Sequence, residues 1–275
     1  MIKDYKSAVE NIRFELSQYL KTGKLKSLVA GVSGGIDSAL SVALARPVCD
    51  NLGVKLFCRS ITISTNKPEE IARAEHVGRS FGHDFKEVNL SDTFEKLIPD
   101  LTEDFFETDK NTHAFKIRQG NIKARMRMMY LYDLAAKNKG MVLSTDNYTE
   151  LLLGFWTLHG DVGDYGMIQN LWKTEVYAMA EYIVENTENK DNAEALKSCI
   201  DAVPTDGLGI TNSDLDQIGA SSYAEVDKIL IEHLKNPDNK DLLNNKVVQR
   251  KYASEFKRNN PFNIPRNKIT DEPYF

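Results

Sequence analysis

A short apolar run leads directly into a glycine-rich turn near residue 30, and this junction limits the possible folds more than any other feature. Residues 27–32 have the composition of a buried strand, and the turn Ser33-Gly34-Gly35-Ile36-Asp37-Ser38 follows at once, ahead of a helical pattern. Two glycines let the backbone turn tightly and approach an anion without a Cβ in the way. Backbone amides and the following helix start then point at the anion. The junction predicts a strand–loop–helix unit that binds phosphate.

The same alternation of strand and helix continues along the chain. It predicts an α/β fold, a parallel sheet flanked by helices on both faces, in one domain over 1–275 with a C-terminal tail from about 259. Because ligands of such folds lie at the carboxyl ends of the strands, the loops after Val32, Ile63 and Thr145 should face one site. Further strands are expected at 54–63, 85–90 and 141–145. Helices are expected at 5–23, 38–50, 68–81, 91–101, 119–139, 149–155, 172–184, 213–218, 224–234 and 241–257.

Composition excludes several other classes of protein. The formal net charge of -5 argues against a general nucleic-acid binder, which needs a basic surface. The three cysteines are scattered and show no Cys-x-x-Cys spacing, so we expect reduced thiols in a cytoplasmic protein rather than disulfides or a zinc site. No apolar run approaches the ~20 residues of a membrane span, and no signal peptide is visible, so no membrane partner is expected.

The phosphate loop matches neither of the two common nucleotide-binding fingerprints. No lysine follows the glycines as in a Walker loop, and the Gly-x-Gly-x-x-Gly dinucleotide pattern is absent. Ser33 and Ser38 offer hydroxyl donors, whereas the Asp37 carboxylate is suited to hold Mg²⁺ that bridges to phosphates. The simpler alternative is an ordinary strand–helix turn in which Ser and Asp cap the helix.

Three further segments, taken with the loop, resemble one enzyme family. Ser-Gly-Gly-x-Asp-Ser is similar to the signature of the ATP-pyrophosphatase (PP-loop) superfamily, whose adenine nucleotide alpha hydrolase-like fold is Rossmann-like. The segments 120–128, 144–150 and 154–161 resemble, in order, the motifs of ammonia-dependent NAD synthetases. The resemblance implies a homodimeric ligase for the final step of NAD biosynthesis. It would convert deamido-NAD, ATP and ammonia to NAD, AMP and pyrophosphate through an adenylated carboxylate, with Mg²⁺ as cofactor.

The resemblance also implies roles for individual residues. Asp37 and Glu150 would hold Mg²⁺, and Lys173 would assist catalysis together with Asp161, which would bind or deprotonate ammonium. The ATP-binding set would be Gly31, Val32, Ser33, Gly34, Gly35, Ile36, Asp37, Ser38, Arg59, Thr65, Thr145, Lys173 and Thr205. The deamido-NAD-binding set would be Arg125, Leu158, Asp164, Phe256 and Lys257.

Several of these positions have a simpler alternative explanation. Arg125 and Arg127 are two residues apart on one helix, so only one of them should point at substrate. Glu150 could merely favour the start of a helix, and Lys173 could be an exposed lysine at another. Thr205 could cap a turn. The family usually has Lys and His where Leu158 and Phe256 stand, which leaves those two contacts open.

Two other functions remain as alternatives to the prediction of an NAD synthetase. One is a tRNA-modifying ligase of the same superfamily, which would want a basic RNA-binding face or catalytic cysteines. The other is a nucleotide-binding regulatory module without turnover. The chain has no room for a fused glutaminase, so free ammonia is the expected nitrogen source, and a separate glutaminase subunit is left open.

Overall fold

The computed structural model describes residues 1–64, 66–204 and 213–273. Within these ranges one parallel sheet has the strand order β3-β2-β1-β4-β5. The parallel α/β architecture expected from the sequence is therefore confirmed. The strands are β1 (Ser27–Gly31), β2 (Lys55–Thr62), β3 (Asp84–Asn89), β4 (Gly140–Ser144) and β5 (Tyr165–Gly166).

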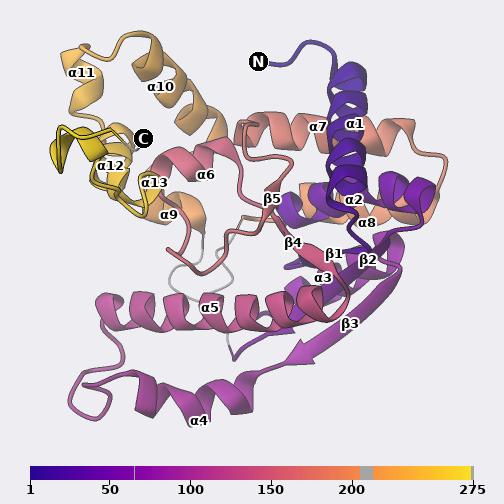
Figure 1. Cartoon of the computed structure of the whole chain (residues 1–275), viewed down its shortest axis with the longest axis horizontal. Coiled ribbons are helices and arrows are strands. Elements are labelled where there is room, and N and C mark those ends of the chain that lie inside the picture. The colour runs from indigo at the N-terminus through magenta and orange to yellow at the C-terminus, as the bar shows by residue number, and fades with distance from the viewer. Residues whose placement is uncertain (65, 205–212, 274–275) are drawn as a thin grey trace.

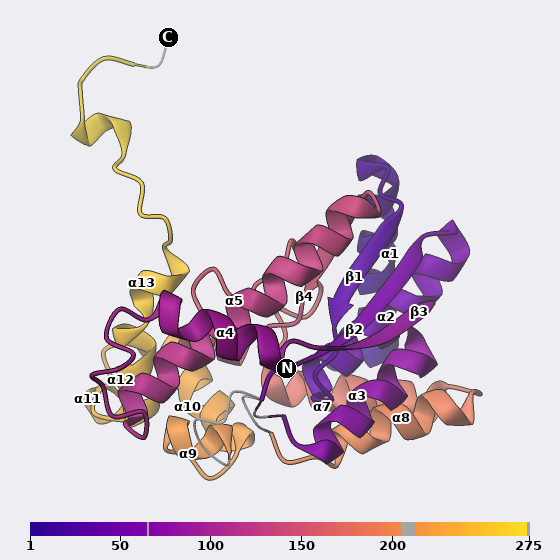
Figure 2. The same ribbon diagram turned by 90° about the horizontal axis from the view of Figure 1, so that it is seen from below.

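Helices follow most of the strands and surround the sheet (Figures 1 and 2). In chain order they are α1 (Tyr5–Gly23), α2 (Ile36–Leu52), α3 (Pro68–Phe81), α4 (Ser91–Leu101), α5 (His113–Lys137), α6 (Tyr148–Leu153), α7 (Lys173–Asn186), α8 (Lys190–Ile200), α9 (Asp214–Ile218), α10 (Tyr223–Lys235), α11 (Lys240–Leu243), α12 (Lys246–Ala253), α13 (Glu255–Arg258) and the 3₁₀ turn η1 (Arg266–Lys268).

The central strand β1 is buried on both faces. Because side chains alternate along a strand, Leu28 and Ala30 pack into the larger core with α1, α2, α7 and α8, whereas Val29 packs toward α5. Helices cover both faces of the sheet at this strand, since all three side chains are 0% exposed.

The C-terminal part of the chain forms a second packed group beside the sheet. Leu153 of α6, Ile218 of α9, Val226 and Leu230 of α10 and Val247 of α12 share one buried cluster. This group brings the last helices next to the loops that follow β4 (Figure 1). Beyond α13 the chain runs away from the body of the molecule, as Figure 2 shows.

Several helices differ from the sequence expectation. Helix α5 begins at His113 rather than 119, because the Thr112 hydroxyl caps it by accepting from the N–H of Phe115. The single helix expected at 241–257 is three short ones, since Asn245 caps a new start at α12. Helix α8 and the two-residue strand β5 were not expected. On α5, Met129 is 67% exposed, whereas Met126 and Met128 are buried.

The N-terminal helix is part of the core rather than a free surface. Val9, Leu16 and Leu20 are each at most 3% exposed and pack in the main cluster. The three cysteines are free and buried, as expected of reduced thiols. Within the described residues, every helix is too short or too polar to cross a bilayer.

Candidate active site

Hydrogen bonds from hydroxyl groups within the phosphate loop stabilise its conformation. Ser38 Oγ accepts from the N–H of Ser33 at 3.2 Å and donates to the carbonyl of Gly35 at 3.1 Å. Gly34 has φ +80°, and a Cβ there would collide with the carbonyl oxygen of Glu70 on α3. Glycine is therefore required at this turn, both by conformation and by space. Gly35 caps α2 in an extended conformation without a side chain.

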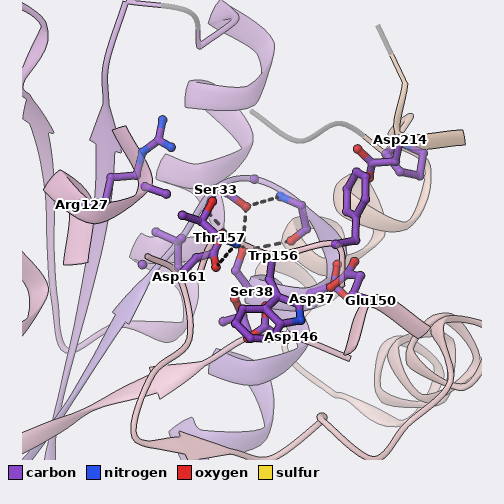
Figure 3. Close-up of a pocket in the computed structure, with 18 of the residues that line it drawn as sticks. Ser33, Asp37, Ser38, Arg127, Asp146, Glu150, Trp156, Thr157, Asp161 and Asp214 are labelled. Carbon is purple, nitrogen blue, oxygen red and sulfur yellow. Dashed lines mark hydrogen bonds between the residues drawn. The ribbon is translucent and has the colours of Figure 1, made fainter. Parts of the chain in front are cut away.

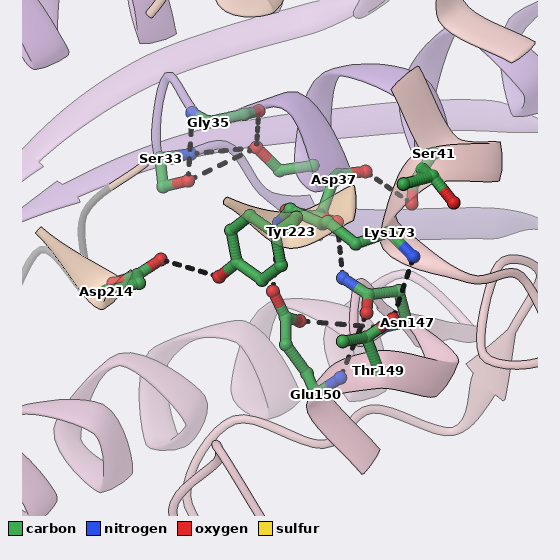
Figure 4. A network of polar contacts seen from close by, with 12 residues as sticks. Ser33, Gly35, Asp37, Ser41, Asn147, Thr149, Glu150, Lys173, Asp214 and Tyr223 are labelled. Atoms are coloured by element: carbon green, nitrogen blue, oxygen red, sulfur yellow. Dashed lines mark hydrogen bonds and ion pairs between the residues drawn. The ribbon is translucent and has the colours of Figure 1, made fainter. Parts of the chain in front are cut away.

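A buried lysine joins two carboxylates from different elements. The Nζ atom of Lys173, the first residue of α7, donates to Asp37 Oδ2 at 2.5 Å and to Glu150 Oε1 at 2.9 Å. Asn147 Nδ2 donates to the other carboxylate oxygen of Asp37, Oδ1, at 2.8 Å. Figure 4 shows these side chains converging from the starts of α2, α6 and α7. The alternative of an exposed Lys173 is wrong, because the residue is 2% exposed.

This cluster fixes the charge of the lysine. Burial alone would lower the pKa of Lys173, but the charges of Asp37 and Glu150 outweigh it and raise the pKa well above the usual range. Burial and the charge of Asp37 raise the pKa of Glu150, and the contact with Lys173 opposes that rise. Glu150 also completes a capping box with Asn147 at the start of α6. Its helix-capping and charge-pairing roles therefore coexist.

Two more carboxylates lie close to the cluster. Asp146 accepts from Ser144 Oγ at 2.9 Å, and burial together with the charge of Asp161 raises its pKa to about 7. Asp161 accepts from the N–H of Thr157 at 2.8 Å, and burial raises its pKa to about 6. Burial therefore holds the pKa of each of these carboxylates above its ordinary range. The site thus concentrates acidic groups beside one strongly charged ammonium group.

The lysine and the four carboxylates line one cavity of about 400 Å³. Figure 3 shows Asp37, Asp146 and Glu150 on one side of it and Arg127 on the other. Its volume lies in the range of small-molecule sites. The cavity is lined by the phosphate loop from Gly31 to Ser38, by Arg59, Thr145, Asp146, Glu150, Asp161, Lys173 and Lys257, and by Arg127 and Met128 of α5.

The two arginines of α5 point to different places, as their spacing predicts. Arg127 lines the cavity and donates from Nε to the carbonyl of Ile61 and from a guanidinium nitrogen to Asn66 Oδ1. Arg125 lies outside this cavity and donates to the carbonyl of Leu158 at 3.0 Å. Arg127 is thus the better-placed cation for the cavity, although the family motif implied Arg125.

The other residues implied to bind deamido-NAD are dispersed. Lys257 lines the cavity and a neighbouring cavity of about 330 Å³, where Leu158 also lies. Asp164 accepts from Tyr132 Oη and from the N–H of Val142, so it ties α5 to β4. Phe256 is 63% exposed. Of this set, only Lys257 lies on the main cavity.

The remaining ATP-binding positions differ among themselves. Thr145 lines the cavity at the end of β4. Arg59 contributes to the lining, but its guanidinium group forms an ion pair with Asp84 at 2.7 Å and is 6% exposed. Thr65 and Thr205 lie outside the described residues. The main-chain carbonyl of Arg59 accepts from the N–H of Val32 and helps to shape the start of the loop.

The carboxylates suit a hard divalent cation. Mg²⁺ in phosphate-transfer sites is bound by one or two carboxylates and completed by phosphate oxygens. Asp37 and Glu150 offer that pair, and both already face one cation, the Lys173 ammonium group. Among the described side chains, no three metal-binding groups converge on one point, so phosphate oxygens would have to complete the coordination.

Sequence reasoning missed several groups of this site. It quoted Asp146 and Asn147 within a motif but assigned them no role, although Asn147 binds Asp37 directly. It also missed Tyr223, whose ring lies 5.0 Å from Lys173 Nζ, and Asp227, which is 2% exposed. Tyr223 and Asp227 lie four residues apart, a spacing that shares one helix face and could have pointed to both.

The strand order and the loop after β1 are those of an α/β nucleotide-binding protein with a PP-loop. Residues 8–261 match the family model described as NAD synthase, and the chain belongs to that family. A protein named NH(3)-dependent NAD(+) synthetase from Thermoplasma acidophilum is 31% identical over 266 residues, covering 96% of this chain and 99% of its own. The protein of the same name from Finegoldia magna is 31% identical, covering 92% and 97%.

Solved structures agree with the fold. The NMN synthetase of Francisella tularensis superposes with a TM-score of 0.77 at 23% identity and covers the full length of both chains. The NH3-dependent NAD synthetase of Campylobacter jejuni, solved with a nitrate ion, gives a TM-score of 0.70 at 23% identity, covering 95% of this chain and 100% of its own. At this level of identity the comparison concerns the fold alone.

Proposed function

We propose that this protein is an ammonia-dependent ligase that makes NAD from deamido-NAD, with ATP as co-substrate. The observation that carries the proposal is the meeting of the phosphate loop and the Asp37–Lys173–Glu150 cluster on one cavity. The glycine-rich loop at the start of α2 suits the leaving pyrophosphate, and a fixed ammonium group suits the charge that develops at the α-phosphate. Family membership and the names of the relatives support the same activity.

The reaction would proceed in two steps within this cavity. First, an oxygen of the nicotinate carboxylate bonds to the α-phosphorus of ATP, and the bond to the β-phosphate oxygen breaks to release pyrophosphate. Then the nitrogen of ammonia bonds to the acyl carbon, loses a proton, and AMP leaves with its electron pair on oxygen. The phosphate loop binds the phosphates and positions the reactants for attack, and Lys173 stabilises the charge that develops at the α-phosphate in the transition state.

Magnesium and the acceptor of the ammonium proton complete the proposal. Asp37 and Glu150 would hold Mg²⁺, which supplies charge neutralisation to the phosphates when bound. Asp161 would bind ammonium or take its proton, since a carboxylate of raised pKa accepts a proton near neutral pH. The buried thiols are consistent with a cytoplasmic enzyme. A homodimer is proposed as well, for which exposed Met129 and Tyr132 on α5 offer apolar surface.

Pyrophosphate release with identification of the product tests the proposal. Deamido-NAD and ammonium chloride should give pyrophosphate, AMP and NAD in equal amounts. Nicotinate mononucleotide, which carries the same carboxylate, and unmodified tRNA serve as competing substrates in parallel reactions. Turnover only with tRNA would favour the modifying ligase, and no turnover with any substrate would favour the regulatory module. Faster amidation of the mononucleotide would change the substrate but keep the chemistry.

A further inference from the structure

A buried carboxylate behind the site connects the elements that carry Glu150 and Lys173. Asp227 of α10 is 2% exposed. Its Oδ1 accepts from Thr149 Oγ1 at 2.5 Å, and its Oδ2 accepts from the N–H of Thr174 at 2.9 Å and from Thr174 Oγ1 at 2.7 Å. Thr149 is in the first turn of α6, and Thr174 is in the first turn of α7. One side chain therefore binds the starts of two helices.

The hydroxyl of Thr149 extends this connection to the lysine itself. It donates to Asp227 and accepts from the N–H of Lys173 at 2.9 Å. Because the Asp227 carboxylate can only accept, the direction of this chain of hydrogen bonds is fixed. Glu150 directly follows Thr149, and Lys173 directly precedes Thr174. The Asp227 contacts thus set the distance between the two helix starts that bear Glu150 and Lys173.

A second residue of α10 reaches the other end of Lys173. Tyr223 is four residues before Asp227, and its ring lies 5.0 Å from Lys173 Nζ. The Tyr223 hydroxyl donates to Asp214 at 3.2 Å, which anchors the ring (Figure 4). Residues four apart share one face of a helix. A single face of α10 therefore contacts both the main chain of Thr174 and the ammonium group of Lys173.

We propose that Asp227 is a positioning residue, which holds Lys173 within reach of Glu150 and Asp37 while touching no substrate itself. This inference rests on the proposed function, because it assigns the Lys173 cluster to the chemical step. Because the amide of Asp227→Asn keeps only one acceptor oxygen, either the Thr149 hydroxyl or the Thr174 N–H and hydroxyl must face an amide nitrogen. Repulsion between donors then separates the two helix starts. A displacement of the order of 1 Å at a reacting group can cost about a hundredfold in rate.

The experiment compares four variants at a temperature where each is folded, as judged by circular dichroism. Asp227→Asn and Thr149→Val break the connection, and Thr149→Ser preserves the hydroxyl. Glu175→Gln is the matched control. Like Asp227, Glu175 is a buried carboxylate near the start of α7, but it accepts from the N–H groups of Ile2 and Trp172 instead. Steady-state pyrophosphate release gives kcat and KM, and crystal structures give the Lys173–Glu150 distance.

We expect kcat to fall about ten- to hundredfold in Asp227→Asn and Thr149→Val, with KM for ATP nearly unchanged. Thr149→Ser should recover most of the rate, and Glu175→Gln should keep it even if its melting temperature falls. The 2.9 Å contact between Lys173 and Glu150 should open beyond about 4 Å in Asp227→Asn.

A contact that stays closed in folded Asp227→Asn would overturn the inference, whatever the rates. An equal loss of kcat in Glu175→Gln would also overturn it, because the effect would then be general to this helix end. If Asp227→Asn does not fold, the pair of Thr149 variants decides by the same criteria. Failure of the proposed function has a different signature. In that case wild-type protein releases no pyrophosphate with deamido-NAD and ammonium, while the crystallographic contact still tests Asp227.

Discussion

Lys173 Nζ lies 2.9 Å from Glu150 Oε1, although the two residues begin different helices 23 positions apart in the chain. The same nitrogen binds Asp37 at the start of a third helix. Three helix starts therefore meet at one ammonium group. Because helix starts carry partial positive charge, the two carboxylates are favoured there, and they offset the cost of burying the lysine at such a position.

Replacement of Lys173 by methionine should destabilise the protein strongly. The change leaves two carboxylates close together without their cation, and the loss of one partner of a buried ion pair costs about 3–5 kcal/mol. Burial and the charge of Asp37 already raise the pKa of Glu150 in the folded state, and loss of the lysine removes the contact that opposes this rise, so the pKa of Glu150 rises further. Protonation then relieves the deficit at low pH. Urea unfolding should therefore show a larger deficit at pH 8 than at pH 5, and an equal deficit at both would contradict this account.

Asp146→Asn should stabilise the ligand-free protein at alkaline pH. The folded-state pKa of Asp146, about 7, lies above the ordinary value of 3.8, so wild-type stability contributed by this group is lost as pH rises through about 7. A shift of this size corresponds to about 4 kcal/mol as an upper bound. The gain should be present at pH 8 and vanish near pH 4 in chelator-treated protein. Asp191→Asn, at an exposed carboxylate, should show no such trend.

Gly34→Ala should damage the phosphate loop far more than a comparable change elsewhere. Gly34 and Gly53 both have positive φ, but a Cβ at Gly53 meets nothing within 4 Å, whereas one at Gly34 meets backbone. Gly53→Ala should lose only about 1–2 kcal/mol of conformational energy. Gly34→Ala should lose about 2–4 kcal/mol of folding stability, and it should also lose its affinity for ATP. Chemical denaturation and titration with a non-hydrolysable ATP analogue measure both; similar losses in the two variants would refute the steric argument.

Asp161→Asn should separate the two halves of the proposed reaction. Its carboxylate is assigned to ammonium and not to ATP, so the rate of amide formation should fall about 10²–10⁴-fold, the usual contribution of an acid–base group. Adenylation, followed by pyrophosphate release in a single turnover without ammonium, should change much less. Equal losses in both steps would remove Asp161 from its role.

The sequence was sufficient for the architecture because hydrophobic periodicity determines it locally. The strand and helix at 27–52 follow from one apolar run and two glycines, and the structure confirms both within two residues. Breaks such as the one at Asn245 were missed, since a cap depends on a side-chain hydrogen bond that periodicity does not report. The assignment of 1–275 to one domain stays a prediction.

The sequence predicted which kinds of residue form the site but not which of them contact one another. Asp37, Glu150 and Lys173 were each named from motifs, yet their mutual contacts depend on how three helix starts meet in space. The Arg125 and Arg127 assignment also needed the structure, because spacing shows that two residues diverge but not which of them faces inward. The roles of the implied ATP and deamido-NAD contacts remain predictions.

The hydrogen bonds of the last helices have a consequence for how the protein is made. Lys257 donates to the carbonyls of Gly154 and Trp156, and Arg258 donates to those of Leu151 and Leu152. The wall of the cavity is thus completed by side chains that leave the ribosome more than a hundred residues after the backbone they hold. A nascent chain can form its sheet and phosphate loop early, but it cannot assemble a finished binding pocket until Lys257 and Arg258 have been made and have folded back.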